Sequence, residues 1–251
     1  MNLTLAWLYP DSMSIYGDRG NVIALTKRAE WRGIQLDVWR LPKGERLDHL
    51  PDIAMFGGGQ DREQRLIERD FLELKGDTIR QAVEQDVPVL AVCGGFQMLG
   101  HGYRDADGAS IQGLGILDAE TVAPRAKDKR CIGNIVVGTD FGSYADGDLV
   151  GFENHGGRTT LGPNARPLGR VRKGFGNNGR DGTEGARYRN CFGTYMHGSL
   201  LPKNPWFTDY LLEAALERKY GPEAKLEPLD DTLELRAHQA VLFLSHRGGR
   251  G

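Results

Sequence analysis

Cysteine is scarce in this sequence of 251 residues, which contains only Cys93, Cys131 and Cys191. An odd number of cysteines without close pairing argues against a disulfide framework and is typical of proteins from a reducing compartment. The sequence begins with neither a basic segment nor a long apolar one, so we expect no signal peptide. These features predict a cytoplasmic protein.

Long hydrophobic runs and an excess of one charge are also missing. No apolar stretch approaches the roughly 20 residues that span a bilayer, so we expect no membrane insertion. The chain has 32 Lys and Arg against 34 Asp and Glu, a net charge of −2, and no polybasic run. This balance gives no electrostatic signal for nucleic acid or for an anionic membrane surface. The cysteines do not have the spacing of metal ligands, and we expect no metal.

A phosphate-binding loop of the G-x-x-x-x-G-K-[ST] type is absent as well. The glycine-rich stretches "GGGQDREQ" and "GFGNNGRDG" lack its lysine and hydroxyl residue. We therefore expect this chain not to activate a carboxylate with ATP on its own, and we expect no cofactor in it.

The first part of the chain alternates between two hydrophobic periods. Short apolar runs predict strands, and longer amphipathic stretches between them predict helices. The predicted strands are 3–9, 34–41, 53–56 and 87–92. A helix is predicted over 22–31, and one helix or a helix pair over 62–85. This alternation is typical of an α/β fold with a mainly parallel central sheet covered by helices on both faces.

The second part has a different character. Residues 115–169 contain β-type segments with turn signals, and the Gly-, Asn- and Arg-rich stretch 172–189 is interpreted as a long surface loop. A helix is predicted over 205–220 with Asn204 as N-cap, and a last helix over 233–245. We predict a single domain over 1–245 and a disordered tail over 246–251.

The stretch "LAVCGGFQMLG" raises the first question of chemistry. It places Cys93 between a buried strand and the first turn of a helix, where α/β hydrolytic enzymes hold a nucleophile on a tight bend. A helix N-terminus favours the reactive thiolate, and the amide of Gly94 points to where an oxyanion would form. An isolated cysteine is more often a buried structural residue. The strand–Cys–Gly–Gly–helix context favours the nucleophile, and we interpret Cys131 and Cys191 as structural.

Two further segments end at the same predicted sheet edge. "MFGGGQD" runs from a strand into three glycines, and Gly58 or Gly59 is a candidate for a second oxyanion donor, although a plain turn is an equal alternative. His197 ends the strand "CFGTYMHG" and could reach a nucleophile at that edge as a general base. A satisfied core histidine is the alternative for a single His.

These residues converge on a known family. "AVCGGFQMLG" and "GTYMHGSLL" resemble the class I glutamine amidotransferases, and more narrowly their cobyric-acid-synthase-like branch. Within that branch, "YGDRGN", "FGGGQD", "KRCIGN" and "GFENHGGRT" are similar to the glutaminase subunits of lipid II isoglutaminyl synthase. The resemblance implies a class I amidotransferase fold, that is, a flavodoxin-like three-layer sandwich.

The resemblance also implies roles for individual residues. Cys93 would attack the side-chain amide of glutamine, with His197 as the acid and base and Gly94, Gly58 and Gly59 around the oxyanion. Gln97 would help to bind L-glutamine. Arg130 would face the α-carboxylate of glutamine, unless it is a solvated strand arginine. Asn154 and His155 of "ENHGG" are weaker substrate-binding candidates.

One position departs from the pattern. Many triad amidotransferases have a Glu two residues after the histidine, and this sequence has Ser199 there. A hydroxyl cannot stabilise an imidazolium as a carboxylate can. The site would therefore be a Cys–His dyad, or a carboxylate would come from elsewhere in the chain, with Asp18 and Glu153 as candidates, or from a partner. Our working hypothesis is that a partner chain supplies the carboxylate.

The implied function is glutamine hydrolysis that supplies ammonia to a partner. The partner would be a MurT-like Mur-ligase subunit that holds ATP and Mg and forms a heterodimer with this chain. The pair would amidate the α-carboxylate of D-Glu in the lipid II stem peptide near the inner face of the bacterial membrane. Three alternatives stay open: another acceptor of the cobyrinate or nucleotide type, a hydrolase that needs no partner, and a catalytically silent scaffold.

Overall fold

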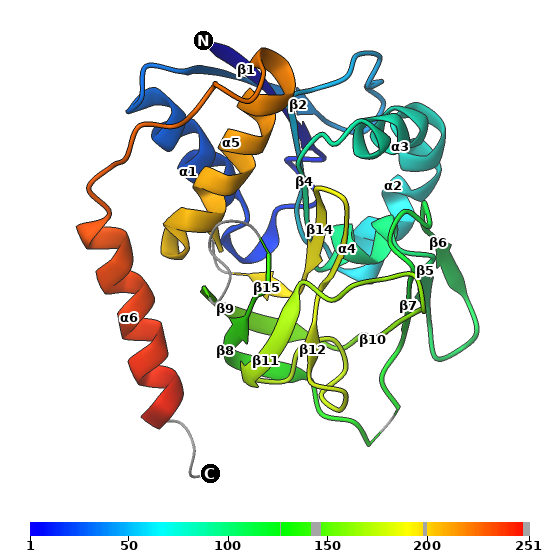
Figure 1. Cartoon of the computed structure of the whole chain (residues 1–251). Coiled ribbons are helices and arrows are strands. Elements are labelled where there is room, and N and C mark those ends of the chain that lie inside the picture. The colour runs from blue at the N-terminus through cyan, green and yellow to red at the C-terminus, as the bar shows by residue number, and fades with distance from the viewer. Residues whose placement is uncertain (126, 142–146, 198–199, 248–251) are drawn as a thin grey trace.

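The structure is a computed structural model, and it describes residues 1–125, 127–141, 147–197 and 200–247 (Figure 1). Its centre is a six-stranded sheet with the order β13-β14-β4-β3-β1-β2. The neighbours from β14 to β2 run parallel, and β13 is antiparallel at the edge. The strands are β1 (Asn2–Leu8), β2 (Gln35–Leu41), β3 (Ile53–Phe56), β4 (Val89–Val92), β13 (Ala186–Tyr188) and β14 (Cys191–Thr194).

Helices cover both faces of this sheet (Figure 1). The helices α1 and α5 lie on one side and α2 and α3 on the other, so the predicted flavodoxin-like three-layer arrangement is confirmed. β3 and β4 are fully buried along their length, which is why they appear in the sequence as continuous apolar runs. The helices are α1 (Arg19–Glu30), α2 (Asp61–Leu74), α3 (Gly76–Glu84), α4 (Gly94–Leu99), α5 (Pro205–Tyr220) and α6 (Thr232–Arg247).

Two smaller sheets lie at the carboxyl ends of the parallel strands (Figure 1). One has five strands in the order β12-β11-β8-β9-β15, and the other has four in the order β10-β7-β5-β6. The strands are β5 (Gly102–Arg104), β6 (Ser110–Gln112), β7 (Ala119–Val122), β8 (Cys131–Gly138), β9 (Asp148–His155), β10 (Arg158–Leu161), β11 (Gly169–Lys173), β12 (Thr183–Glu184) and β15 (Met196–His197). Short 3-10 helices are η1 (Ile15–Gly17) and η3 (Leu201–Lys203).

Some expected elements need correction. The segment 62–85, expected as one helix or a helix pair, is a pair, because the backbone leaves the helical conformation at Lys75, whose buried ammonium bonds Asp70 and the carbonyl of Glu45. Other expectations were wrong. The segment 172–189, predicted as a surface loop, contributes β12 and β13 to two sheets. Asn204 precedes α5 as predicted, but its side chain bonds the backbone of Val150 rather than capping the helix.

The C-terminal boundary also differs from the prediction. The helix α6 continues through Arg247, so residues 246 and 247 are not part of a disordered tail. Residues 248–251, the rest of that predicted tail, lie outside the described residues. α6 packs on η3 and on β8 and β9 of the five-stranded sheet.

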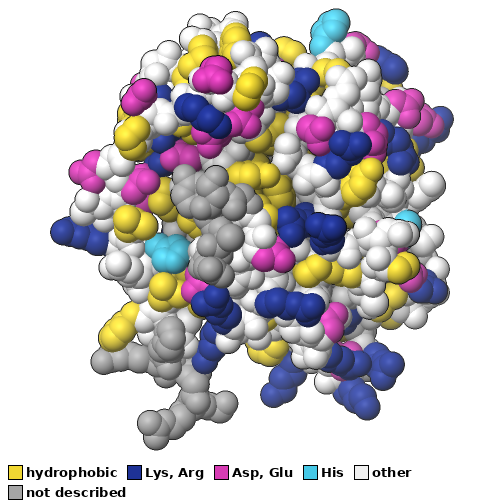
Figure 2. Space-filling model, viewed as in Figure 1, with side chains coloured by type: hydrophobic (Ala, Val, Ile, Leu, Met, Phe, Trp, Pro, Cys, Tyr) yellow, Lys and Arg dark blue, Asp and Glu magenta, His cyan; other side chains and the backbone are white. Residues whose placement is uncertain are grey.

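The surface carries charges of both signs. Over the upper half of the face in Figure 2, Lys and Arg side chains lie close to Asp and Glu side chains. Several charged groups form ion pairs. Arg28 of α1, which is buried, bonds Asp209 of α5, and this contact links the two helices. Arg28 also bonds Asp231. Within the described ranges, the structure contains no helix long and apolar enough to cross a membrane.

Candidate active site

Cys93 stands on a strained bend between β4 and α4. Its φ of 49° and ψ of −105° lie in a region that side-chain-bearing residues rarely adopt, as expected for a nucleophile held at a strand–helix junction. Its backbone N–H donates to the carbonyl of Thr194 at 2.8 Å, which fixes the bend to β14. Gly94 is required next to it, because a Cβ there would lie 2.8 Å from the carbonyl oxygen of Gly59.

His197 reaches the same place from the second sheet. It lies on β15, which pairs with β9 at Phe152, and its side chain is fully buried. Gly58 shows how closely the groups meet: a Cβ at this glycine would lie 2.7 Å from Cε1 of His197 and 3.3 Å from Cβ of Cys93. The structure therefore brings the predicted nucleophile and the predicted base together.

A carboxylate from the same chain stands behind His197. Oδ1 of Asp18 lies 3.5 Å from Nδ1 of His197, and both side chains are fully buried. Oδ2 of Asp18 accepts a hydrogen bond from the N–H of Gly58 at 2.7 Å. The working hypothesis that a partner supplies the carboxylate is corrected accordingly, because the cis candidate Asp18 occupies that place. Ser199 lies outside the described residues.

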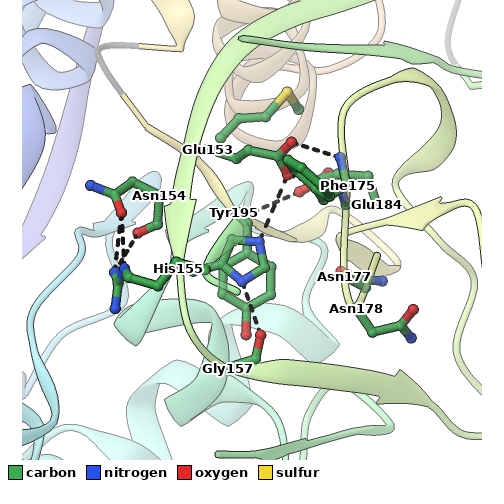
Figure 3. A network of polar contacts seen from close by, with 12 residues as sticks. Glu153, Asn154, His155, Gly157, Phe175, Asn177, Asn178, Glu184 and Tyr195 are labelled. Atoms are coloured by element: carbon green, nitrogen blue, oxygen red, sulfur yellow. Dashed lines mark hydrogen bonds and ion pairs between the residues drawn. The ribbon is translucent and has the colours of Figure 1, made fainter. Parts of the chain in front are cut away.

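Glu153, the other candidate carboxylate from this chain, lies near a different histidine, His155. The carboxylate of Glu153 accepts from the N–H groups of Phe175 and Gly176 at 2.7 and 2.9 Å, and lies 3.8 Å from Nε2 of His155 (Figure 3). Because those contacts use both of its oxygens, Glu153 belongs to the buried network beside the site rather than to the Cys93–His197–Asp18 arrangement.

The electrostatics favour a charged imidazole. Burial alone would lower the pKa of His197, but the negative charge of Cys93 and the contacts with Asp18 and Cys93 outweigh burial and raise that pKa to about 10. At neutral pH the ring is therefore an imidazolium. Such a group can donate a proton to a leaving amine.

Of the three candidate oxyanion donors, one N–H group already has an acceptor within the chain, and the other two belong to backbones that lie close together. The N–H of Gly58 is already donated to Asp18, so the prediction that it binds the oxyanion is wrong for this structure. A Cβ on Gly94 would lie 3.0 Å from the nitrogen of Gly59, so these two backbones meet beside Cys93. The N–H groups of Gly59 and Gly94 remain the predicted pair.

A cavity of about 670 Å³ opens in front of Cys93. Its volume suits a small polar ligand such as an amino acid with its water. Residues predicted from the sequence line it, namely Gly59, Cys93, Gln97, Arg130, Asn154 and His155. Asp61, Arg62 and Tyr103 line it too and were not predicted.

Arg130 and Asn154 form one unit at the cavity. The guanidinium donates to Oδ1 of Asn154 at 3.1 Å and to its carbonyl at 3.2 Å. The Arg130 residue is exposed to solvent, and the cavity is open beside it. An anionic group of a ligand would meet a positive charge there.

Gln97 is held by residues that sequence reasoning missed. Its Oε1 accepts from Gln64 at 2.9 Å, and its Nε2 donates to the hydroxyl of Tyr195 at 3.1 Å. The ring of Tyr195 stacks on the ring of His155 with centroids 3.8 Å apart (Figure 3). Tyr195 carries a weak signal in the sequence, because it stands two residues before His197 in the predicted strand "CFGTYMHG". Gln64 carries no comparable signal.

Cys131 and Cys191 are buried, and burial raises the pKa of both thiols, as expected for structural residues. Among the residues that the structure describes, no group of three or more His, Cys, Asp or Glu side chains could hold a metal ion.

Comparisons with known proteins agree with this geometry. Residues 4–205 match the model of the CobB/CobQ-like glutamine amidotransferase domain. The chain is 42% identical over 246 residues to the lipid II isoglutaminyl synthase (glutamine-hydrolyzing) subunit GatD of Staphylococcus aureus, covering 98% of this chain and 97% of that one. It is 41% identical over 234 residues to the GatD subunit of Streptococcus pneumoniae, covering 92% and 87%.

The fold comparison is independent of close sequence similarity. A glutamine amidotransferase structure from Thermotoga maritima superposes with a TM-score of 0.53 at 18% identity, covering 96% of this chain and 94% of that one. The fold and the Cys–His–Asp site together define a class I glutamine amidotransferase. The chain belongs to the CobB/CobQ-like branch of these enzymes.

Proposed function

We propose that this chain is the glutaminase subunit of a two-subunit, glutamine-hydrolysing ligase that amidates lipid II. The proposal rests on the position of Cys93, which stands on a strained bend beside the buried side chain of His197. The carboxylate of Asp18 lies on the Nδ1 side of that imidazole. The nearly full-length similarity to the GatD subunit of S. aureus supports the choice of acceptor.

The geometry suggests how the glutamine amide is cleaved. Sγ of Cys93 attacks the side-chain carbonyl carbon, and the resulting oxyanion is held by the N–H groups of Gly59 and Gly94. His197 gives its proton to the departing nitrogen, so that ammonia leaves and a glutamyl thioester stays on Cys93. A water molecule then attacks the thioester while His197 takes its proton, which releases glutamate and restores the sulfur.

The cavity suits the rest of the substrate. Glutamine carries an α-carboxylate and an α-ammonium group, and the cavity offers Arg130 for the first and Asp61 for the second. Gln97 lines the same cavity, and we assign it to glutamine binding. His155 and Asn154 complete the wall, and we assign them to substrate positioning.

The partner would perform the second half of the reaction. We propose a MurT-like Mur-ligase subunit that binds ATP and Mg and takes the α-carboxylate of D-Glu in the lipid II stem peptide as acceptor. Ammonia is mostly protonated in neutral water, so a path shielded from solvent would carry it between the sites. The heterodimer would work in the cytoplasm, near the inner face of the membrane.

The test is glutamate release from glutamine by the purified chain, alone and with the Mur-ligase-like subunit from the same organism. We expect release that disappears in Cys93→Ala and increases with the partner. High turnover without any partner would instead indicate a free-standing hydrolase. No release in either state, with Cys93 unmodified by an electrophilic glutamine analogue, would indicate a scaffold.

The acceptor needs its own assay. Incubation of the two subunits with glutamine, ATP, Mg and lipid II should convert one stem-peptide carboxylate to an amide, detected by mass spectrometry. A glutaminase that responds to its partner but leaves lipid II unchanged would favour the alternative of another acceptor in the same family.

A further inference from the structure

The chain passes from one sheet to another immediately before His197. β14 ends at Thr194 in the central sheet, and β15 begins at Met196 in the five-stranded sheet. Tyr195 is the single residue between them, and it is fully buried. A backbone that changes sheets loses its ladder partners, so its buried N–H groups need acceptors from elsewhere.

A buried glutamate supplies these acceptors. Oε1 of Glu184 accepts from the backbone N–H of Tyr195 at 2.7 Å and from the hydroxyl of Thr194 at 3.0 Å. That hydroxyl in turn accepts from the N–H of Met196 at 3.0 Å. Both successive N–H groups of the crossing therefore depend on Glu184, one directly and one through Thr194.

The same crossing holds both catalytic residues. The carbonyl of Thr194 accepts from the N–H of Cys93 at 2.8 Å, and His197 follows directly after Met196. A shift at this point would move the imidazole relative to the sulfur. A misplacement of about 1 Å can cost a factor of about 100 in rate.

Glu184 is itself firmly held. It ends β12, and the following Gly185 approaches β14 so closely that a Cβ there would lie 2.2 Å from the carbonyl oxygen of Gly193. The side chain of Asn177 bonds both the N–H and the carbonyl of Gly185, at 2.8 and 2.9 Å. In Figure 3, Glu184 lies close to Tyr195.

The charge state of Glu184 fits this role. Burial, together with a smaller effect of the nearby Glu153, raises its pKa to about 8, against the effect of its two hydrogen bonds. At neutral pH the group is a neutral acid, which can accept hydrogen bonds through its carbonyl oxygen without placing a second charge beside Glu153. A glutamine has the same shape and offers the same acceptor.

We infer that Glu184 is a positioning residue of the glutaminase: it fixes the sheet crossing at Tyr195 and thereby sets the place of His197 relative to Cys93. The inference rests on the proposed glutaminase function. Glu184 does not line the cavity, so it acts through the backbone and not on the substrate.

The test compares two variants of equal size. Glu184→Gln keeps the acceptor oxygen, and Glu184→Leu removes it. We expect E184Q to keep kcat within about threefold of wild type, and E184L to lower kcat by about 10- to 100-fold with KM within about twofold. Alkylation of Cys93 by iodoacetamide, which needs no glutamine turnover, should slow in E184L and not in E184Q.

Asp70→Asn is the matched control, because Asp70 is another buried carboxylate that accepts three hydrogen bonds, from Tyr9, Gly44 and Lys75, but none at the crossing. It should lower the melting temperature and leave kcat per folded molecule unchanged. If E184L does not fold, Thr194→Val removes only the hydroxyl relay to Met196 and should lower kcat by about 3- to 10-fold.

Two results would overturn the inference. One is a folded E184L, or T194V in its place, with the kcat and alkylation rate of wild type. The other is an equal loss of kcat in D70N, which would mean that any buried defect lowers activity. Wild-type protein without glutaminase activity, alone or with its partner, would instead reject the proposed function, and the alkylation rates would still test the positioning.

Discussion

Replacing Asp18 by Asn should separate a Cys–His–Asp site from a dyad. The asparagine can still accept from the N–H of Gly58, but its amide group would then face Nδ1 of His197. An N–H donor at that position disfavours the imidazolium, so the pKa of His197 should fall from about 10 toward the ordinary histidine value. The overall fold should persist, because the side chain keeps its size.

The magnitude follows from the 3.5 Å separation of the two buried groups. With an effective dielectric constant of about 20, the attraction between a carboxylate and an imidazolium at this distance is about 5 kcal/mol. This is an upper value, and it corresponds to roughly three powers of ten in rate. We expect D18N to lower kcat by about 100- to 1,000-fold with little change in KM.

The assay is glutamate release as a function of pH, with and without the partner subunit. Asp52→Asn is the matched control, since Asp52 is a buried aspartate that bonds Thr4 and Lys219 away from the cavity. D52N should keep wild-type kcat. A D18N protein with kcat within threefold of wild type and an unchanged pH profile, in either state, would refute the role of Asp18.

Three further predictions follow from single contacts. Gly58→Ala places a Cβ 2.7 Å from Cε1 of His197. This variant should lower kcat for glutamate release by at least about 100-fold. Normal activity would contradict the close approach of Gly58 and His197. Arg130→Gln should raise KM for glutamine by about 10- to 100-fold with kcat retained, and an unchanged KM would favour a solvated arginine. In the folded protein, burial raises the pKa of Glu184 to about 8. In the unfolded chain, a glutamate loses its proton above about pH 4.3. Between these two pH values, only the folded protein keeps the proton. Wild type should therefore lose stability as pH rises from about 4.3 to 8, by up to about 1.4 kcal/mol per pH unit, and urea midpoints of E184Q should lack this slope.

Cys93 could be identified from the sequence as a candidate nucleophile because its signals are local. A buried apolar strand, Cys93, two glycines and a short helix follow one another within a dozen residues, and each can be recognised from its neighbours. The three-layer fold was predictable for the same reason, since the periods of alternating strands and helices are properties of short windows. The Thr232–Arg247 helix was placed nearly correctly on the same basis.

Contacts between distant segments were not predictable in the same way. Asp18 precedes α1 and His197 ends β15, and only the folded sheets bring them to 3.5 Å. The three glycines after β3 look equivalent in the sequence, but the contact with Asp18 uses the N–H of Gly58, and the backbone of Gly59 lies against Gly94. Both outcomes depend on tertiary packing that no short window contains.

Composition misled the interpretation of 172–189. Gly, Asn and Arg are typical of exposed loops, yet Asn177 and Glu184 are fully buried here because each satisfies backbone groups that would otherwise lack partners. A buried polar side chain in this role looks like a loop residue in the sequence.

The central claim is that Cys93, assisted by His197 and Asp18, forms a covalent glutamyl intermediate. The most direct measurement is rapid acid quench of the enzyme during turnover of glutamine, followed by mass spectrometry of the peptide that contains Cys93. The account predicts a glutamyl adduct on this cysteine in wild type and in the complex, and none in Cys93→Ala, which should also release no glutamate. Glutamate release by Cys93→Ala at the wild-type rate would contradict it.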